Sequence, residues 1–277
     1  MSLLHSILLG LIQGVAEFLP LSSSGHLAIA EQLLGVQGAS EIPGFFDVLL
    51  HLGTLAAVIL AFWPDVRALC HEAFCTLHLA HRKRGERPDR LQKRMLAFAV
   101  LGTLPLLLVL LFQDAAESLY SNTFFIGFAL LVTGGLLFWA DRASHGNKDI
   151  KSATLGDALT VGLAQAIAVV PGLSRSGTTI AAGLLCGFDR SFAVRFSFLL
   201  SIPAVLGANI LSLVKAISAG ITWTYLPMYL VGVAVAFVSG YCAIYLLRML
   251  MQRGKFGGFA YYCWGAGLVT LVLSLVA

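Results

Sequence analysis

Two short elements rich in Ser and Gly carry the residues of this sequence that are suited to chemistry. The first reads Pro-Leu-Ser-Ser-Ser-Gly-His over 20–26, and the second reads Pro-Gly-Leu-Ser-Arg-Ser-Gly over 171–177. Each element interrupts an apolar stretch, where an ionisable side chain costs several kcal/mol unless it is paired or hydrated. Glu17, His26 and Arg175 therefore each require a functional or structural reason.

The second element, around Arg175, has the composition of an anion site. A Gly- and Ser-rich turn that leads into a helix presents unpaired backbone N–H groups and the positive end of the helix dipole. The Arg guanidinium adds a planar fork of donors that matches phosphate oxygens. The hydroxyl and glycine residues of both elements complete this predicted phosphate-binding site: Ser22, Ser24, Gly25, Ser174, Ser176, Gly177, Thr178 and Thr179.

The residues just before and within the first element suggest what happens to the bound anion. Glu17 lies four residues after Gln13, so the two side chains project from one face of a helix. A carboxylate repels an anion, so we expect Glu17 to hold a divalent cation or to act as a general base. Ser23 and His26 offer a nucleophile and a proton carrier. Together these residues predict phosphoryl chemistry within a membrane.

The same residues also have structural interpretations. Ser and Thr in apolar helices usually bond to backbone carbonyls and pack. An ion pair between Glu17 and Arg175 that only holds helices together is a second alternative. Glu31, Asp47 and His51 are expected to surround the site or lie at the membrane interface. The functional interpretation rests on the occurrence of these residues at both elements.

The composition places both elements in a membrane protein. The 277 residues are 58% hydrophobic and only 12% charged, and their mean hydropathy is +0.87. Soluble chains carry about 25% charged residues, and disordered chains carry more charge and fewer apolar residues. The net charge of +4 does not indicate nucleic-acid binding, because the basic residues gather in loops, as Lys and Arg do in cytoplasmic loops of membrane proteins.

Hydropathy predicts an all-α, polytopic membrane fold that forms a single integral membrane domain over 1–277. A span needs about 20 apolar residues, and two interrupted stretches, 3–35 and 155–188, have halves too short for that. Those two stretches are predicted to be re-entrant helical hairpins. The uninterrupted stretches are predicted to be transmembrane helices: 45–63, 95–112, 122–140, 192–214, 225–247 and 258–277.

The two hairpins are copies of each other. Residues 10–35 align without a gap with residues 162–187, and 11 of these 26 positions are identical. Each hairpin precedes three spans, so one copy crosses the membrane an odd number of times. We therefore expect two inverted-topology repeats, over about 3–140 and 155–277, with their Ser-rich tips meeting near the membrane midplane.

The distribution of basic residues gives the predicted orientation. Lys and Arg gather in a basic loop over about 64–94, and again over 141–151 and 248–255. These three segments alternate correctly to form the cytoplasmic set. Both termini and the mouth of the first hairpin are then expected on the outer side.

The motifs over 13–26 and 171–179 resemble those of the undecaprenyl-diphosphate phosphatase family, which is linked to bacitracin resistance. The similarity extends along most of the chain, including 196–200 and Pro203. It implies an enzyme of the bacterial inner membrane that hydrolyses undecaprenyl diphosphate to undecaprenyl phosphate and inorganic phosphate. The reaction recycles the lipid carrier of cell-wall synthesis. The resemblance also implies access from the periplasmic side, contact with membrane lipid and a homodimer.

The resemblance assigns roles by position. Gln13 and Glu17 match a Glu/Gln-x-x-x-Glu motif linked to a divalent cation, magnesium or calcium. Ser23 and His26 match residues proposed for catalysis, and Arg175 matches the phosphate-binding loop. Position 13 is Gln, which leaves Glu17 as the main negative charge.

The expected mechanism has Arg175 clamp the diphosphate while Ser23, assisted by His26, attacks the terminal phosphorus. Attack by water with His26 as base is the less favoured variant. A transporter that moves a polyprenyl phosphate through the same anion site is the main alternative function, because many carriers have inverted repeats and broken helices. A purely structural scaffold leaves Glu17 and Arg175 unexplained.

Overall fold

The structure is a computed structural model that describes residues 2–33, 44–77, 89–112, 119–143, 146–219 and 223–276. Residues 78–88 of the predicted basic loop lie outside these described residues. The helices are α1 (Leu3–Phe18), α2 (Ser23–Leu33), α3 (Gly44–Ala61), α4 (Trp63–Thr76), α5 (Arg90–Thr103), α6 (Leu106–Val109), α8 (Thr123–Ala143), α9 (Leu155–Ile167), α10 (Arg175–Leu185), α11 (Arg190–Ala219), α12 (Leu226–Gln252) and α13 (Gly258–Val276). Short 3-10 turns occupy Leu110–Phe112, Leu119–Ser121 and Trp223–Tyr225.

The predicted all-α, multi-pass fold is confirmed. Within the described ranges, five helices or continuous helix pairs are long and apolar enough to cross a membrane. They are Arg90–Val109, Thr123–Ala143, Arg190–Lys215, Trp223–Gln252 and Gly258–Leu275. A sixth span is reached if α3 and α4, which meet at a 90° bend, are counted together. Each of these lies on a segment that hydropathy predicts to span.

The segment predicted as a basic loop over 64–94 is partly helical, and this corrects the sequence-based expectation. Helix α4 begins directly after α3, because Pro64 in its first turn cannot continue α3 but fits the start of a new helix. Helix α5 begins at Arg90, where the Asp89 side chain accepts hydrogen bonds from Leu91 N at 2.8 Å and Gln92 N at 3.3 Å. Helical structure therefore occupies both ends of the predicted basic loop, up to Thr76 and from Arg90.

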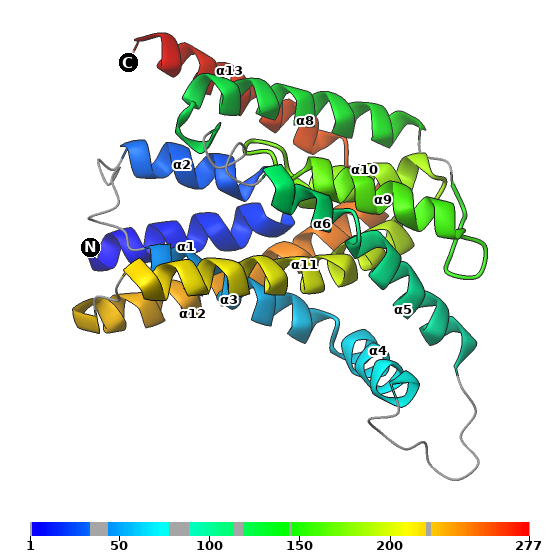
Figure 1. The fold of residues 1–277 in the computed structure, drawn as a ribbon. Coiled ribbons are helices and arrows are strands. Elements are labelled where there is room, and N and C mark those ends of the chain that lie inside the picture. The colour runs from blue at the N-terminus through cyan, green and yellow to red at the C-terminus, as the bar shows by residue number, and fades with distance from the viewer. Residues whose placement is uncertain are drawn as a thin grey trace.

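The two interrupted stretches form two helical hairpins, as predicted. Helices α1 and α2 are separated by 19–22, which contains Pro20, and α9 and α10 are separated by 168–174, where Gly172 has φ +88°. In Figure 1 the first hairpin occupies the left half of the bundle and the second hairpin the right half. Both chain termini lie at the left end. The ends of α8 and α12 and the start of α11 lie at the right end, here called the basic end.

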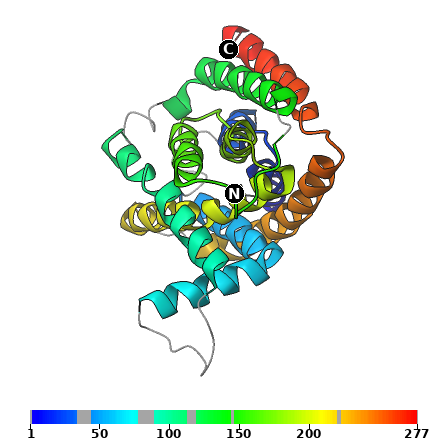
Figure 2. The same cartoon turned by 90° about the vertical axis from the view of Figure 1, so that its right-hand side faces the viewer.

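The longer helices surround these hairpins (Figure 2). Helix α1 packs against α12 and α9 packs against α5, while α3 packs against α11 and α8 against α13. The closest approaches occur at glycines. A Cβ on Gly10 would lie 2.5 Å from Gly232 O, and a Cβ on Gly162 would lie 2.4 Å from Gly102 O. Small residues allow such contact between helix backbones.

Candidate active site

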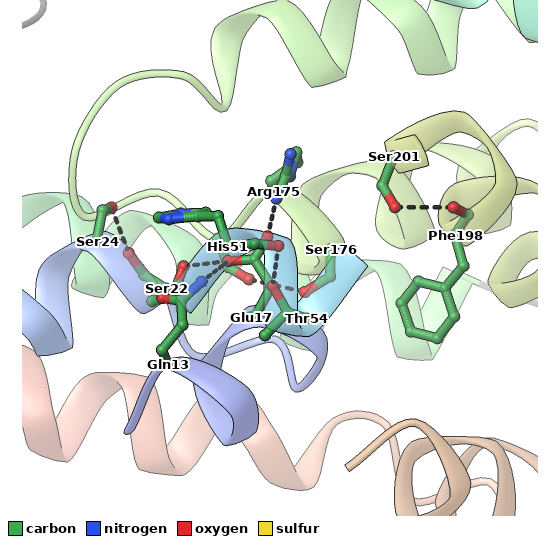
Figure 3. Close-up of polar contacts among 12 residues, drawn as sticks. Gln13, Glu17, Ser22, Ser24, His51, Thr54, Arg175, Ser176, Phe198 and Ser201 are labelled. Carbon is green, nitrogen blue, oxygen red and sulfur yellow. Dashed lines mark hydrogen bonds and ion pairs between the residues drawn. The ribbon is translucent and has the colours of Figure 1, made fainter. Parts of the chain in front are cut away.

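Three side chains converge on the Glu17 carboxylate, near the end of α1 (Figure 3). Ser23 Oγ donates a hydrogen bond to Glu17 Oε2 at 2.7 Å, and Gln13 Nε2 donates to the same oxygen at 3.2 Å. Arg175 Nη2 donates to Glu17 Oε1 and forms an ion pair with it. Glu17 is only 6% exposed and Gln13 is fully buried. The carboxylate thus joins α1 to the first residue of α2 and the first residue of α10.

The first tip holds Ser23 in place through an unusual backbone conformation. Ser22 has φ +71°, and it is the only described residue other than glycine with a positive φ. The left-handed region costs an L-residue roughly 1–2 kcal/mol, and such strain collects at functional sites. Ser22 Oγ accepts a hydrogen bond from Gly25 N at 3.3 Å and lies 3.4 Å from Ser24 Oγ. These contacts stabilise the turn from which Ser23 points to Glu17.

The second tip repeats this hydrogen-bond pattern. Ser174 caps α10 by accepting from Gly177 N at 3.1 Å, and its Oγ lies 3.3 Å from Ser176 Oγ. Arg175 follows the cap and therefore starts the helix, where its guanidinium reaches across to Glu17. The two tips are in direct contact, because Ser176 Oγ donates to Leu19 O at 3.3 Å.

The remaining residues of the predicted phosphate loop lie on the inner side of α10. Thr179 Oγ1 donates to Arg175 O at 2.8 Å and lies 2.5 Å from Ser197 Oγ of α11. Thr178 is 6% exposed, and its Oγ1 has no hydrogen-bond partner among the described residues. A Cβ on Gly177 would come within 3.0 Å of Pro20 Cβ, so the two tips pack closely at this glycine. The structure therefore brings all the predicted phosphate-binding residues to the two tips.

His26 makes different contacts from those expected. Its Nδ1 lies 2.9 Å from Ser22 O, and its Nε2 lies 2.8 Å from the Tyr262 hydroxyl. A carbonyl oxygen only accepts, so in the neutral ring Nδ1 carries the proton and Nε2 accepts from Tyr262. Ser23, which was expected to pair with His26, instead donates to Glu17.

Sequence reasoning missed three residues that support the tips. Tyr262 on α13 contacts His26, and Ser197 on α11 contacts Thr179. Thr133 on α8 accepts a hydrogen bond from Ser174 N at 3.3 Å and donates to Gly172 O at 3.4 Å. Each is a residue with a hydroxyl group within a predicted span. Thr133 is fully buried, and Tyr262 and Ser197 contact residues of other helices. A lone hydroxyl in an apolar span was the available signal, but it is also typical of ordinary packing.

The ion-pair alternative and the expected place of His51 can be compared with these contacts. The ion pair between Glu17 and Arg175 does form, but Ser23 and Gln13 share the same carboxylate, so the pair belongs to a larger polar cluster. His51, on α3, bonds through Nδ1 to Asp47 O of its own helix at 2.8 Å. Figure 3 shows His51 beside the cluster, although no hydrogen bond joins it to Glu17, Ser23 or Arg175 within the described residues.

A divalent cation was expected at Gln13 and Glu17. Gln13 Oε1 is buried and has no hydrogen-bond partner among the described residues, so it is available as a ligand. Within the same residues no group of three or more His, Cys, Asp or Glu side chains is arranged to hold a metal ion. One carboxylate and one amide oxygen fit an ion such as Mg²⁺, which keeps several waters and binds through substrate phosphates. They do not form a complete protein cage.

Comparison with known proteins identifies the family. The family model described as bacitracin resistance protein BacA matches residues 6–269. A protein of Halothermothrix orenii is 41% identical over 99% of both chains, and one of Syntrophotalea carbinolica is 42% identical over 99% of this chain and 100% of its own. A protein of Methanobrevibacter smithii is 40% identical over 99% of both chains, and all three are named undecaprenyl-diphosphatase. The chain belongs to the bacitracin resistance protein BacA family.

Proposed function

We propose that this protein is an integral membrane phosphatase that hydrolyses undecaprenyl diphosphate to undecaprenyl phosphate and inorganic phosphate. The family membership and the names of the relatives support this reaction. The observation that carries the chemistry is the hydrogen bond from Ser23 Oγ to Glu17 Oε2, because it places a hydroxyl nucleophile against a base. Arg175 at the start of α10 supplies the positive charge that a diphosphate requires.

The contacts of Glu17 suggest how substrate binding starts the reaction. In the free enzyme the Arg175 guanidinium is held by Glu17 Oε1. The terminal phosphate of the substrate competes for that guanidinium, and its oxygens bind the fork of N–H donors in place of the carboxylate. Glu17 then takes the Ser23 proton while Ser23 Oγ attacks the terminal phosphorus. The phosphoanhydride bond breaks, and undecaprenyl phosphate leaves with the bonding electron pair.

The second half of the reaction hydrolyses the phosphoserine that results. A water molecule loses a proton to a nearby base, attacks the phosphorus and releases inorganic phosphate, and the Ser23 oxygen recovers a proton from Glu17. His26 and Tyr262 form a hydrogen-bonded pair beside the first tip. This pair is suited to accepting the proton that the water molecule loses. In this scheme the base for Ser23 is Glu17, and His26 acts through Tyr262 and solvent.

A divalent cation, magnesium or calcium, is proposed as a cofactor. Gln13 Oε1 and the Glu17 carboxylate would hold it, together with the phosphates of the substrate. When bound it would neutralise charge on the diphosphate and so favour attack by Ser23. The single carboxylate predicts weak binding in the absence of substrate.

We also propose an orientation in which the protein lies in the bacterial inner membrane with both termini and the first hairpin toward the periplasm. The basic end, opposite the termini, then faces the cytoplasm. Reciprocal packing of α1 on α12 and α9 on α5 supports an inverted relation between the two repeats. A homodimer in contact with membrane lipid completes this proposal.

Phosphate release by the purified protein in detergent tests the proposed function. Undecaprenyl diphosphate is the substrate, and Ser23→Ala is compared with Ser218→Ala, an exposed serine on α11. We expect release by the wild type and by Ser218→Ala, and none by Ser23→Ala although lipid binding persists. A transporter needs two compartments and would release no phosphate in detergent. Normal turnover by Ser23→Ala would contradict the role of the nucleophile.

A further inference from the structure

A cavity of about 480 Å³ lies at the basic end, away from the Glu17 cluster. It is formed where α3 bends into α4, where α11 begins and where α12 ends. Its apolar wall includes Phe62, and three arginines line it: Arg190, Arg195 and Arg248. Nothing in the proposed phosphatase mechanism uses these residues.

The three arginines outnumber the carboxylates that they contact. Arg195 forms an ion pair with Asp65, and Arg190 Nη1 lies 2.7 Å from Asp141 Oδ1. The Arg248 guanidinium lies over the Phe62 ring, 5.4 Å from its centroid. Among the described residues Arg248 forms no ion pair with a carboxylate. The cavity therefore carries a net positive charge even after both pairs are counted.

Two of the guanidinium donors also lack acceptors. Arg195 Nε and Arg190 Nη1 are buried and have no hydrogen-bond partner within the described residues. Arg190 Nη1 is near Asp141 Oδ1, but the two atoms do not meet at a hydrogen-bonding angle. Buried N–H groups without acceptors are unfavourable, and a ligand with anionic oxygens is of the kind that supplies such acceptors.

We propose that this cavity binds a phosphate group, either in the headgroup of an anionic phospholipid or as free inorganic phosphate. Arginine forks match phosphate oxygens in geometry and charge. The cavity lies where membrane-spanning helices end, which is the level of lipid headgroups, and basic pockets between such helices bind anionic lipids. The site is separate from the proposed active site and does not depend on the phosphatase assignment.

Arg248→Gln is the informative variant. It removes a charge that stabilises no carboxylate partner in the described structure, so the variant is expected to fold. Arg253→Gln is the matched control, because Arg253 is exposed just after α12 and does not line the cavity. Both proteins and the wild type are purified in detergent with equal amounts of phosphatidylglycerol and phosphatidylcholine, and retained lipid is measured by native mass spectrometry.

If the ligand is a lipid headgroup, we expect the wild type and Arg253→Gln to retain phosphatidylglycerol preferentially. Arg248→Gln should retain about fivefold less, because that is the contribution of one basic residue near a membrane surface to lipid affinity. A second arm adds inorganic phosphate without lipid and measures the Tm. A Tm increase in the wild type that Arg248→Gln reduces, without any lipid preference, would identify free phosphate as the ligand.

Inorganic phosphate is also a product of the proposed reaction and can bind at the active site. Only the difference between the wild type and Arg248→Gln is therefore assigned to the cavity. If neither the lipid preference nor the phosphate-induced Tm shift changes in Arg248→Gln, the proposal is overturned, whether or not the protein is an active phosphatase.

Discussion

Arg175, the first residue of α10, forms an ion pair with Glu17 of α1, although 158 residues separate them in the chain. The pair joins the two hairpins at their tips. It also places two groups with proposed roles side by side. The Arg175 guanidinium is proposed to bind the diphosphate, and the Glu17 carboxylate is proposed to act as the base. In the free enzyme Glu17 Oε1 therefore occupies the place on the Arg175 guanidinium that the substrate phosphate is proposed to take, while Ser23 already lies against Glu17 Oε2.

A charge-swapped pair of variants separates the structural role of this ion pair from its chemical role. Glu17→Arg alone and Arg175→Glu alone each leave a buried charge unpaired, which costs about 3–5 kcal/mol. The double variant restores the pairing, so we expect its Tm to recover most of the loss, measured by thermal unfolding in detergent. Phosphate release should remain absent in the double variant, and its recovery would show that the pair serves only the fold.

Glu17→Gln tests the carboxylate as a base. The amide retains a hydrogen-bonding shape beside Ser23 and Gln13 but cannot accept a proton. Loss of a general base lowers kcat by roughly 10²–10⁴-fold, and steady-state phosphate release measures it. Glu31→Gln, on α2 outside the cluster, is the control and should keep nearly full activity. An active Glu17→Gln enzyme would assign the base to another residue.

Tyr262→Phe tests the contact that sequence reasoning missed. The variant removes the hydroxyl that lies 2.8 Å from His26 Nε2 and keeps the ring, which stacks on His26 at 5.6 Å between centroids. We expect kcat to fall about tenfold with little change in KM and with an altered pH profile of kcat, because proton transfer is impaired. Tyr261→Phe is the control, since Tyr261 contacts Phe138 and Trp264 instead. Equal pH profiles for the two variants would remove Tyr262 from the mechanism.

Gly10→Ala and Gly162→Ala test the close helix contacts that hold the hairpins. In each case the new methyl group would meet a backbone oxygen at 2.5 Å or less, Gly232 O or Gly102 O. Such overpacking destabilises a protein by about 1–3 kcal/mol, and thermal unfolding in detergent measures the change. Gly135→Ala, where a Cβ has nothing within 4 Å, is the control and should not lower the Tm.

The connection from α8 to α9 gives a pH prediction outside the membrane spans. Hydrogen bonds from the Ser152 hydroxyl and then from the Lys151 and Ser152 backbone N–H groups lower the pKa of Asp149. A lowered folded-state pKa contributes stability above the unfolded value of about 3.9, and this stability is lost as the pH falls through the folded value. The Tm of Asp149→Asn should therefore lie below that of the wild type at neutral pH and approach it in acid. A difference that does not depend on pH would exclude this cause.

The membrane character, the spans and the two broken hairpins were determined by the sequence alone. Hydropathy and helix-breaking residues act locally, so Pro20 and the Pro171–Gly172 pair interrupt their helices whatever surrounds them. The internal repeat and the motifs likewise identified Glu17 and Arg175, because buried charge is scarce in such a composition. The helical start of the basic segment at Trp63 was missed, because the composition of 64–94 as a whole is that of a polar loop.

Only the tertiary structure decided which groups meet. Ser23 lies near His26 in sequence, yet the left-handed turn at Ser22 directs its hydroxyl to Glu17. Tyr262 reaches His26 from a helix that begins more than 200 residues later. Periodicity records which face of a helix is buried, but hydrogen-bond partners depend on how separate helices rotate and pack against one another. That arrangement is a property of the whole fold, and it is what assembles the proposed base, nucleophile and phosphate-binding arginine at one place.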